Sequence, residues 1–449
     1  MAKRSAQQLR RTAAQMHALA AVRDDIGPQE TGHGRGYLRE FTQHFREYDS
    51  ILSPGDLQQR LAAASTILIG DYHALPSCQR FAAQLIEPSA RDRRVVLGVE
   101  AVLARDQRIL DAWWRREIAE GELRRRLRFD REWGYPWAPF YELLSTARDH
   151  VEGIYALDCM PREDLRRIRS RDRHAAIKIA EIRERHPNAA IFVLFGESHL
   201  APEHLPRAID ELLPEEKILT ILQNVDALYW QAVAQQADAV SIGKNAVCVF
   251  NSSPLEKYES YRLCLDGWNA ADDDLPDFAP AIYNLIFSLT RSLGFRLNSP
   301  RNGTQPRYLS DLLPEVVTLA EYPNRLDTKF DEKTCAYLPD ANLFVIKEFQ
   351  MAEAAEECAR FLYSACRGMV RLSSAAQPIE DALARFGSRL LCPEFGAKDQ
   401  NAVLGDFLYQ NYLAGKVSIP ALRRVFLSKQ ETREQARQTL AKLEHLARA

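Results

Sequence analysis

Histidine and glutamate residues that could bind a metal ion follow apolar segments in the first half of the chain. The loops GDYH (residues 70–73) and GESH (residues 196–199) each come directly after an apolar run, and Glu100 ends another run. A glycine permits a tight turn after the run, so that the histidine three positions later can point back toward it. Two neutral imidazoles and a carboxylate are a common donor set for a transition-metal ion with an open position for water. We therefore expect His73, Glu100 and His199 to bind a divalent metal ion.

Glu100 needs a partner, because a buried, ionised carboxylate is very costly without one. We therefore expect an arginine, a histidine or a metal ion beside it.

Two further carboxylates, Glu197 and Asp71, lie inside the histidine loops. Glu197 in the second loop has three interpretations: a general base, an extra ligand or a residue at a helix N-terminus. Asp71 in the first loop is the other candidate for taking a proton from a bound water molecule.

Six aromatic residues follow one another closely between residues 129 and 141. One interpretation is an apolar wall or lid for a planar ligand such as haem, which needs aromatic contacts and an axial tyrosine or histidine. The other is that Trp137, Phe140, Tyr141 and Leu144 form the buried stripe of a helix. We favour the helix for these four residues and expect Trp133 and Tyr135 to face a pocket.

Six short runs between residues 65 and 250 are continuously apolar rather than alternating, which is expected for strands covered on both faces. Long helical patterns separate the runs. Such alternation predicts an α/β fold, a mostly parallel sheet with flanking helices. Ligands bind outside the carboxyl ends of strands in such sheets, which is where the two loops and Glu100 lie. The runs are residues 65–70, 94–100, 153–158, 190–195, 217–222 and 246–250.

The rest of the chain reads as mainly helical. The first 58 residues contain helical patterns around a glycine-rich stretch, and the patterns after about residue 255 are helical at residues 278–293, 342–370 and 421–449. We predict an N-terminal helical segment (residues 1–58), an α/β domain with the site (residues 59–252) and a mainly α C-terminal domain (residues 253–449). We expect the C-terminal helices to mediate homo-oligomerisation or to act as a scaffold.

Composition and charge favour a globular protein without nucleic-acid partners. The chain is 46% hydrophobic and 27% charged, and its net charge of -2 gives no global attraction to nucleic acid or an acidic membrane. Its eight cysteines show no CxxC spacing, which favours reduced, mostly buried thiols. No apolar run reaches the roughly 18–20 residues of a membrane helix. The basic start lacks a compact apolar core and a lipobox-like cysteine, so we expect a cytoplasmic location.

Several sequence blocks, taken in order, resemble the ChaN family, which is described as haem-binding uptake within the Tiki superfamily. The blocks are GDYHALPSCQRFAAQLI, GVEAV, WGYPWAPFYELLSTA, ALDCMPRED, RDRHAAIKIAEI and VLFGESHLA. The superfamily also has TraB-like and erythromycin-esterase-like relatives. The resemblance implies an EreA/ChaN-like fold and, as in several branches of the superfamily, a metal-dependent hydrolytic site at His73, Glu100 and His199. It also implies that Arg171 contributes to the site. ChaN proteins are typically exported lipoproteins, whereas this sequence shows no such signal.

Three functions are consistent with these features. In the first, a divalent-metal-dependent hydrolase, metal-bound water attacks an amide, ester or related bond in a small molecule or peptide. Glu197 or Asp71 then takes the proton, and Arg171 stabilises the developing negative charge. In the second, the chain binds haem without catalysis, through the aromatic run and a tyrosine such as Tyr72 or Tyr135. In the third, it is a non-catalytic interaction protein. We favour the first, and the polar residues at several strand ends count against the third.

Overall fold

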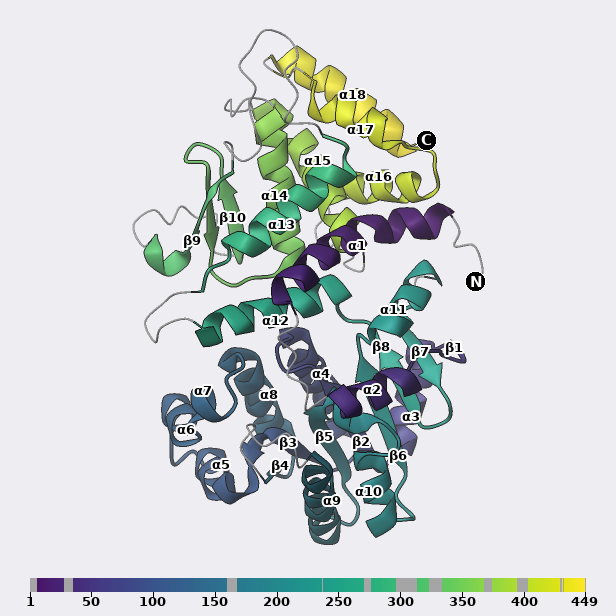
Figure 1. The fold of residues 1–449 in the computed structure, drawn as a ribbon, viewed down its shortest axis with the longest axis vertical. Coiled ribbons are helices and arrows are strands. Elements are labelled where there is room, and N and C mark those ends of the chain that lie inside the picture. The colour runs from purple at the N-terminus through teal and green to yellow at the C-terminus, as the bar shows by residue number, and fades with distance from the viewer. Residues whose placement is uncertain are drawn as a thin grey trace. The chain divides into compact units, whose positions relative to one another are not determined.

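The computed structural model divides into two compact units, which are described one at a time (Figure 1). Residues 26–264 form the site unit, and residues 1–25 together with 265–449 form the helical unit. The domain boundaries predicted after residues 58 and 252 stay predictions. The structure describes residues 6–27, 35–159, 168–235, 237–269, 276–295, 313–322, 333–366, 374–393, 403–428, 430 and 432–448.

A mostly parallel sheet of eight strands forms the centre of the site unit, with the order β1-β7-β8-β6-β2-β5-β3-β4. All six apolar runs are strands of this sheet, and neighbours among them pair in parallel, so the predicted fold class is confirmed. Two short strands that were not predicted, β7 and β1, extend one edge in antiparallel pairing. The strands are β1 (Ser50–Ile51), β2 (Thr66–Asp71), β3 (Val95–Leu103), β4 (Ile154–Asp158), β5 (Ala190–Gly196), β6 (Ile218–Gln223), β7 (Ala239–Ile242) and β8 (Ala246–Val249).

Helices cover both faces of this sheet (Figure 1). Alternate residues of a strand enter opposite cores: Ile67 and Ile69 pack on one face, and Leu68 packs on the other. The first face is covered by α3 (Pro54–Ala63), α4 (Pro76–Asp92), α5 (Gln107–Trp114), α6 (Glu120–Arg126), α7 (Phe129–Glu132) and α8 (Trp137–His150). The second is covered by α2 (Arg35–His44), α9 (Ile168–Arg185), α10 (Leu205–Leu212) and α11 (Asp226–Ala232). Short 3₁₀ turns are η1 (Ala104–Asp106), η3 (Glu197–Leu200) and η4 (Val233–Gln235).

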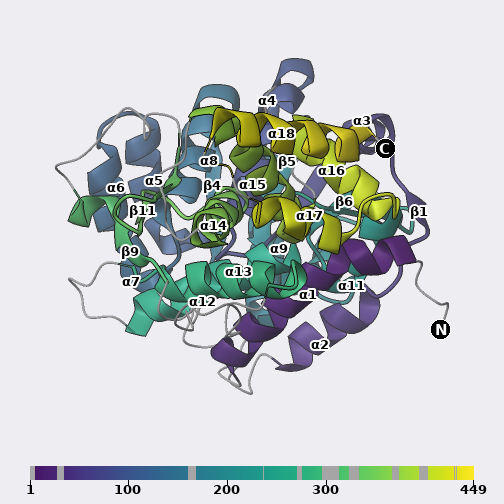
Figure 2. The same cartoon turned by 90° about the horizontal axis from the view of Figure 1, so that it is seen from above.

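The helical unit is mainly α, as predicted for the C-terminal region. Its helices α14 and α15 lie side by side (Figure 2). They pack closely, because Gly387 of α15 faces Ala359 of α14. The helices are α1 (Ala6–Ile26), α13 (Ala279–Ser292), α14 (Met351–Cys366), α15 (Gln377–Leu391), α16 (Val403–Leu413), α17 (Ile419–Phe426) and α18 (Arg433–Arg448), with η6 (Leu319–Glu321) and η8 (Ser374–Ala376). Helix α12 (Pro254–Asn269) begins in the site unit. Among the residues that the structure describes, no helix is both long and apolar enough to span a membrane.

One helix prediction in this unit is wrong at its start. Residues 342–370 were expected to be helical throughout, but Leu343–Ile346 form strand β11, and α14 begins only at Met351. β11 pairs with β10 (Cys335–Leu338) and β9 (Glu315–Thr318) in a three-stranded sheet. A run of four apolar residues fits a strand or a buried helix equally well, and pairing with the neighbouring strands decides between them.

Close packing of β3 against β4 depends on Gly98. A Cβ atom at this position would lie 2.7 Å from Leu157 Cδ1, and Leu157 is fully buried. We expect Gly98→Ala to lower the free energy of unfolding of the site unit by about 1–3 kcal/mol, because buried side chains must shift. Urea unfolding followed by tryptophan fluorescence measures this loss, since five of the six tryptophans lie in the site unit.

The matched control for this substitution is Gly121→Ala in helix α6. Nothing lies within 4 Å of a Cβ atom built at Gly121, and alanine favours a helix over glycine by about 1 kcal/mol. We therefore expect an unchanged or higher urea midpoint for this control. Equal midpoints for the two variants would show that the contact at Gly98 does not limit packing.

Candidate functional site

The three predicted site residues lie together near the carboxyl ends of neighbouring strands, although β3 does not end at Glu100 as expected but continues to Leu103. His73 follows β2, Glu100 lies in β3 and His199 lies in η3 directly after β5, and β5 separates β2 from β3 in the sheet. His73 Nε2 lies 3.9 Å from Glu100 Oε2, and His199 Nε2 lies 4.0 Å from Glu100 Oε1. Both distances exceed a direct hydrogen bond. The two imidazoles therefore flank one carboxylate without bonding to it.

Each imidazole is held through its other nitrogen by an aspartate. His73 Nδ1 lies 2.8 Å from Asp71 Oδ2, and His199 Nδ1 lies 2.5 Å from Asp172 Oδ1. Burial raises the pKa of Asp172, and the hydrogen bond with His199 opposes that rise. When the aspartates are ionised they only accept hydrogen bonds, so each Nδ1 then carries the hydrogen and each Nε2 is left as the basic nitrogen. Asp71 also accepts a hydrogen bond of 2.5 Å from the Gln79 amide. The His73 side chain is 17% exposed and that of His199 is 6% exposed, so His73 is the more accessible base.

Arg171 lies between two buried carboxylates. Its Nη2 atom donates to Glu100 Oε1 at 2.6 Å and to Asp158 Oδ2 at 2.7 Å, and its Nε atom donates to Asp158 Oδ1 at 3.0 Å. Burial alone would raise the pKa of Glu100, but Arg171 and the two imidazoles lower it to about 2. Glu100 is therefore ionised at neutral pH, and an arginine is one of the partners that its burial required.

Gly196 gives the site room rather than a special turn. Its φ of -50° and ψ of 130° are open to any residue. The backbone therefore does not need a glycine for a tight turn here, contrary to the expectation from the sequence. Its N–H group donates a hydrogen bond to Glu100 Oε2. A Cβ atom at this position would lie 3.1 Å from Glu100 Oε2 and 3.2 Å from His73 Nε2. Any side chain at Gly196 would press on the polar cluster.

The aromatic run lies partly beside the site and partly in the hydrophobic core, and the pocket expected for Trp133 and Tyr135 stays a prediction. The ring centres of Trp133 and Tyr135 lie 4.4 Å and 5.2 Å from that of His73, so both rings lie beside the more exposed imidazole. Trp137 and Phe140 lie in α8 and are buried in the hydrophobic core. Trp133 is buried in the same core as these two residues, and Tyr135 and Tyr141 are partly buried against it. Trp133 and Tyr135 form an aromatic wall next to His73 that is continuous with this core.

Glu197 and Tyr72 are both in contact with Lys257, a residue of α12. Lys257 Nζ lies 2.9 Å from Glu197 Oε1 and 4.5 Å from the centre of the Tyr72 ring. Burial raises the pKa of Glu197, and the ion pair with Lys257 opposes that rise. Burial also raises the pKa of Tyr72 well above its ordinary value. Glu197 is therefore tied to a lysine, and Tyr72 stays a neutral phenol.

Asp172 and Lys257 were missed in the sequence. Asp172 lies in α9 beside Arg171, and both are buried although most charged residues of this helix are not. Two adjacent charged residues span only part of a helical turn, so both can face the sheet. The block RDRH contains the signal, because it places an aspartate directly after Arg171. Nothing in the local sequence around Lys257 points to the strand ends.

The predicted metal-ligand trio does not fit a divalent ion in this arrangement. Both oxygens of Glu100 accept hydrogen bonds from the protein, and the guanidinium group of Arg171 lies against one of them. A positive charge this close opposes the binding of a cation. Over the described ranges of the chain, no group of three or more His, Cys, Asp or Glu side chains is arranged to hold a metal ion.

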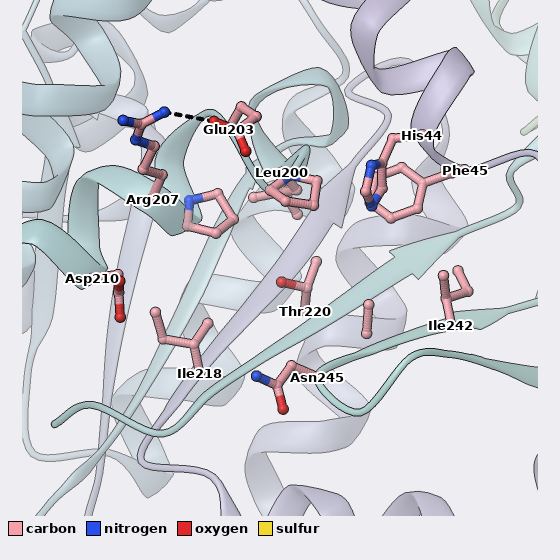
Figure 3. Close-up of a pocket in the computed structure, with 13 residues that line it drawn as sticks. His44, Phe45, Leu200, Glu203, Arg207, Asp210, Ile218, Thr220, Ile242 and Asn245 are labelled. Atoms are coloured by element: carbon pink, nitrogen blue, oxygen red, sulfur yellow. Dashed lines mark hydrogen bonds and ion pairs between the residues drawn. The ribbon is translucent and has the colours of Figure 1, made fainter. Parts of the chain in front are cut away.

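A hollow of about 440 Å³ lies elsewhere in the site unit, beside α10 and over β6 and β8 (Figure 3). Phe45, Leu200 and Ile218 contribute apolar lining. At its rim Glu203 and Arg207 pair with each other at 2.6 Å. None of the three predicted ligands lines it, so the hollow is separate from the strand-end cluster.

The ion pair of Glu100 predicts a pH-dependent contribution to stability. Because the folded-state pKa of Glu100, about 2, lies below the ordinary value of 4.5, the stabilisation is complete above pH 4.5 and is lost as the pH falls toward 2. We expect Glu100→Gln to lower the free energy of unfolding at pH 7 by about 3–5 kcal/mol, because it leaves Arg171 short of a partner. The loss should shrink at pH 3, and urea unfolding at both pH values measures it.

The control for this prediction is a surface ion pair. Glu142 lies 3.0 Å from Arg80, and its side chain is 54% exposed. Glu142→Gln should cost less than about 1 kcal/mol at either pH. If Glu100→Gln cost no more than this control at pH 7, the buried pair would not be a stabilising contact.

Comparison with known proteins gives one family and one solved structure. Residues 57–190 match the family described as haem-binding uptake, Tiki superfamily, ChaN. A structure of ChaN of Campylobacter jejuni with cofacial heme binding is similar at 15% identity and a TM-score of 0.29, over 38% of this chain and 86% of that chain. No curated protein sequence matches the chain. The resemblance seen in the sequence blocks is therefore confirmed for residues 57–190, which match the ChaN family of the Tiki superfamily.

Proposed function

We propose that the strand-end cluster is a hydrolytic site in which His73 and His199 carry protons beside the Glu100 carboxylate. The observation that supports this proposal is the pair of imidazoles, each held at Nδ1 by an aspartate and each facing the same carboxylate through Nε2. An aspartate fixes the tautomer of a catalytic histidine and stabilises the imidazolium ion that forms when it takes a proton. A histidine with a purely structural role does not need an aspartate at Nδ1 and a carboxylate facing Nε2, and here two histidines have this arrangement.

In this proposal His73 is the general base. Its Nε2 atom takes a proton from water as the water oxygen attacks the carbonyl carbon of an ester or amide in a small molecule or peptide. The imidazolium then returns the proton to the leaving oxygen or nitrogen as the bond to carbon breaks. Glu100 stabilises the transient positive charge, and His199 is the second proton carrier on the opposite side of the carboxylate.

The other predicted catalytic residues have supporting roles in this proposal. Asp71 orients His73 instead of taking the proton from water, because its oxygens accept hydrogen bonds from His73 and Gln79. Arg171 holds Glu100 ionised and in place. Glu197 is paired with Lys257 and does not act as the base. No step passes through a metal ion, because the trio does not fit one in this arrangement.

Haem binding is the second candidate function, and the family match of residues 57–190 favours it. Trp133 and Tyr135 offer aromatic contacts beside His73. Tyr72 does not fit an axial ligand here, because iron is bound by the phenolate form of tyrosine, and the burial of Tyr72 favours the neutral phenol. The aromatic wall therefore supports a planar ligand more than the tyrosine does.

Hydrolysis of p-nitrophenyl esters and of a fluorogenic peptide amide by the full chain tests the first candidate. We expect His73→Gln to lower the rate about 10²- to 10⁴-fold, because it removes the general base. His150→Gln is the matched control, since His150 is an exposed histidine of the same unit. Equal rates for the two variants, or the absence of hydrolysis of every substrate in the panel, would argue against the proposal.

Metal and haem are tested on the same purified protein. We expect treatment with a chelator to leave the hydrolytic rate unchanged and elemental analysis to find no stoichiometric metal. A rate that disappears on chelation and returns with a divalent ion would favour the metal-dependent mechanism predicted from the sequence. Titration with haemin tests the second candidate: a saturable Soret shift at micromolar haemin that Tyr135→Ala weakens would favour haem binding.

A further inference from the structure

We infer that Tyr37 is a positioning residue of this site, which extends the site to helix α2, outside the part of the chain that matches the ChaN family. The expected effect of Tyr37 on catalysis rests on the proposed function, whereas its contacts with Asp172 and His204 do not. The Tyr37 hydroxyl donates a hydrogen bond to Asp172 Oδ2. The other oxygen of Asp172 holds His199 Nδ1 at 2.5 Å. Tyr37 and His199 therefore share one carboxylate.

These three residues, counted with their backbone, are removed from solvent. Tyr37 is 9% exposed, Asp172 is 3% exposed and His199 is 4% exposed. A buried carboxylate needs a hydrogen-bond donor at each oxygen, and here the phenol and the imidazole provide one each. Without the hydroxyl, Asp172 Oδ2 loses a buried donor, and the carboxylate is free to rotate away from the plane that aligns His199.

A second histidine fixes Tyr37 from the other side. The ring of His204 is stacked on that of Tyr37, with centres 3.5 Å apart and planes inclined by 9°. His204 Nδ1 lies 2.8 Å from the carbonyl oxygen of Ser198, and its Nε2 atom lies 2.8 Å from Glu40 Oε2. His204 thus connects α2 to the loop that carries His199.

The geometry favours positioning over simple packing. A residue that only packed helix α2 onto the sheet would need the ring of Tyr37 and not its hydroxyl. The hydroxyl instead aims at the one carboxylate that orients His199. The buried Phe41 and Phe45 and the pair of His204 with Glu40 attach α2 to the sheet, which leaves the hydroxyl of Tyr37 with the separate task of holding Asp172.

The test is Tyr37→Phe, which keeps the stacked ring and removes only the hydroxyl. Nitrogen-15 NMR of the histidine side chains reports which ring nitrogen carries the hydrogen, and His199→Gln assigns the signal. In the unaltered protein we expect His199 as the Nδ1–H tautomer with slow exchange of that hydrogen. In Tyr37→Phe we expect faster exchange, a mixture of tautomers and a kcat lowered about 10-fold or more with little change in KM.

Tyr48→Phe is the matched control, because the hydroxyl of Tyr48 accepts a hydrogen bond from Gln235 at 2.8 Å and has no contact with Asp172. We expect it to leave the His199 signal and the rate unchanged. An unaltered His199 signal in Tyr37→Phe would overturn the inference. A changed signal in a chain that hydrolyses nothing would support the positioning role and reject the proposed hydrolysis, so the two failures are distinguishable.

Discussion

The site depends on one buried ion pair, between Glu100 and Arg171. A carboxylate taken from water at the end of a strand is tolerated only where a cation and hydrogen-bond donors replace the water. Arg171 meets that need from α9 and also binds Asp158, so strands β3 and β4 and one helix are joined through a single guanidinium group. The two imidazoles then lie on either side of a charge whose position is fixed. Their basic nitrogens face Glu100 because an aspartate holds the opposite side of each ring.

The structure separates what local sequence can predict from what it cannot. The six buried strands were predictable because each is a continuous apolar run, and His73, Glu100 and His199 were predictable because they directly follow or end those runs. β1 and β7 were not predicted because they are only two and four residues long and are fixed by antiparallel pairing at one end of the sheet. Lys257 lies 60 residues after its partner Glu197 in the sequence. Tyr37 lies 135 residues before its partner Asp172. Contacts between residues so far apart in the sequence are set by tertiary packing, and the spacing of residues along the chain does not predict them.

The metal ligation was predicted from the types of donor residue alone. That prediction did not account for the arginine that binds the same carboxylate.

The two histidine loops look alike in sequence and differ in their surroundings. The His73 loop lies beside Trp133 and Tyr135 and retains contact with solvent. The His199 loop is enclosed by Phe195, Tyr37 and His204. A repeated motif has therefore produced one accessible imidazole and one enclosed imidazole, which suits a division of tasks between contact with substrate and internal proton transfer.

The pairing of β3 with β4 is irregular at the point where Glu100 lies. Val99 pairs with Ala156, and the next pair joins Leu103 to Asp158. Between these two pairs β3 advances by four residues, whereas β4 advances by two. Bulges of this kind bend a strand and redirect a side chain, and they occur often beside active sites. In evolutionary terms, loss of two residues between Val99 and Leu103 would regularise the sheet and remove the room in which Glu100 turns toward Arg171. Sequence alignments of this region should therefore be judged by the length of this segment as well as by the identity of the glutamate.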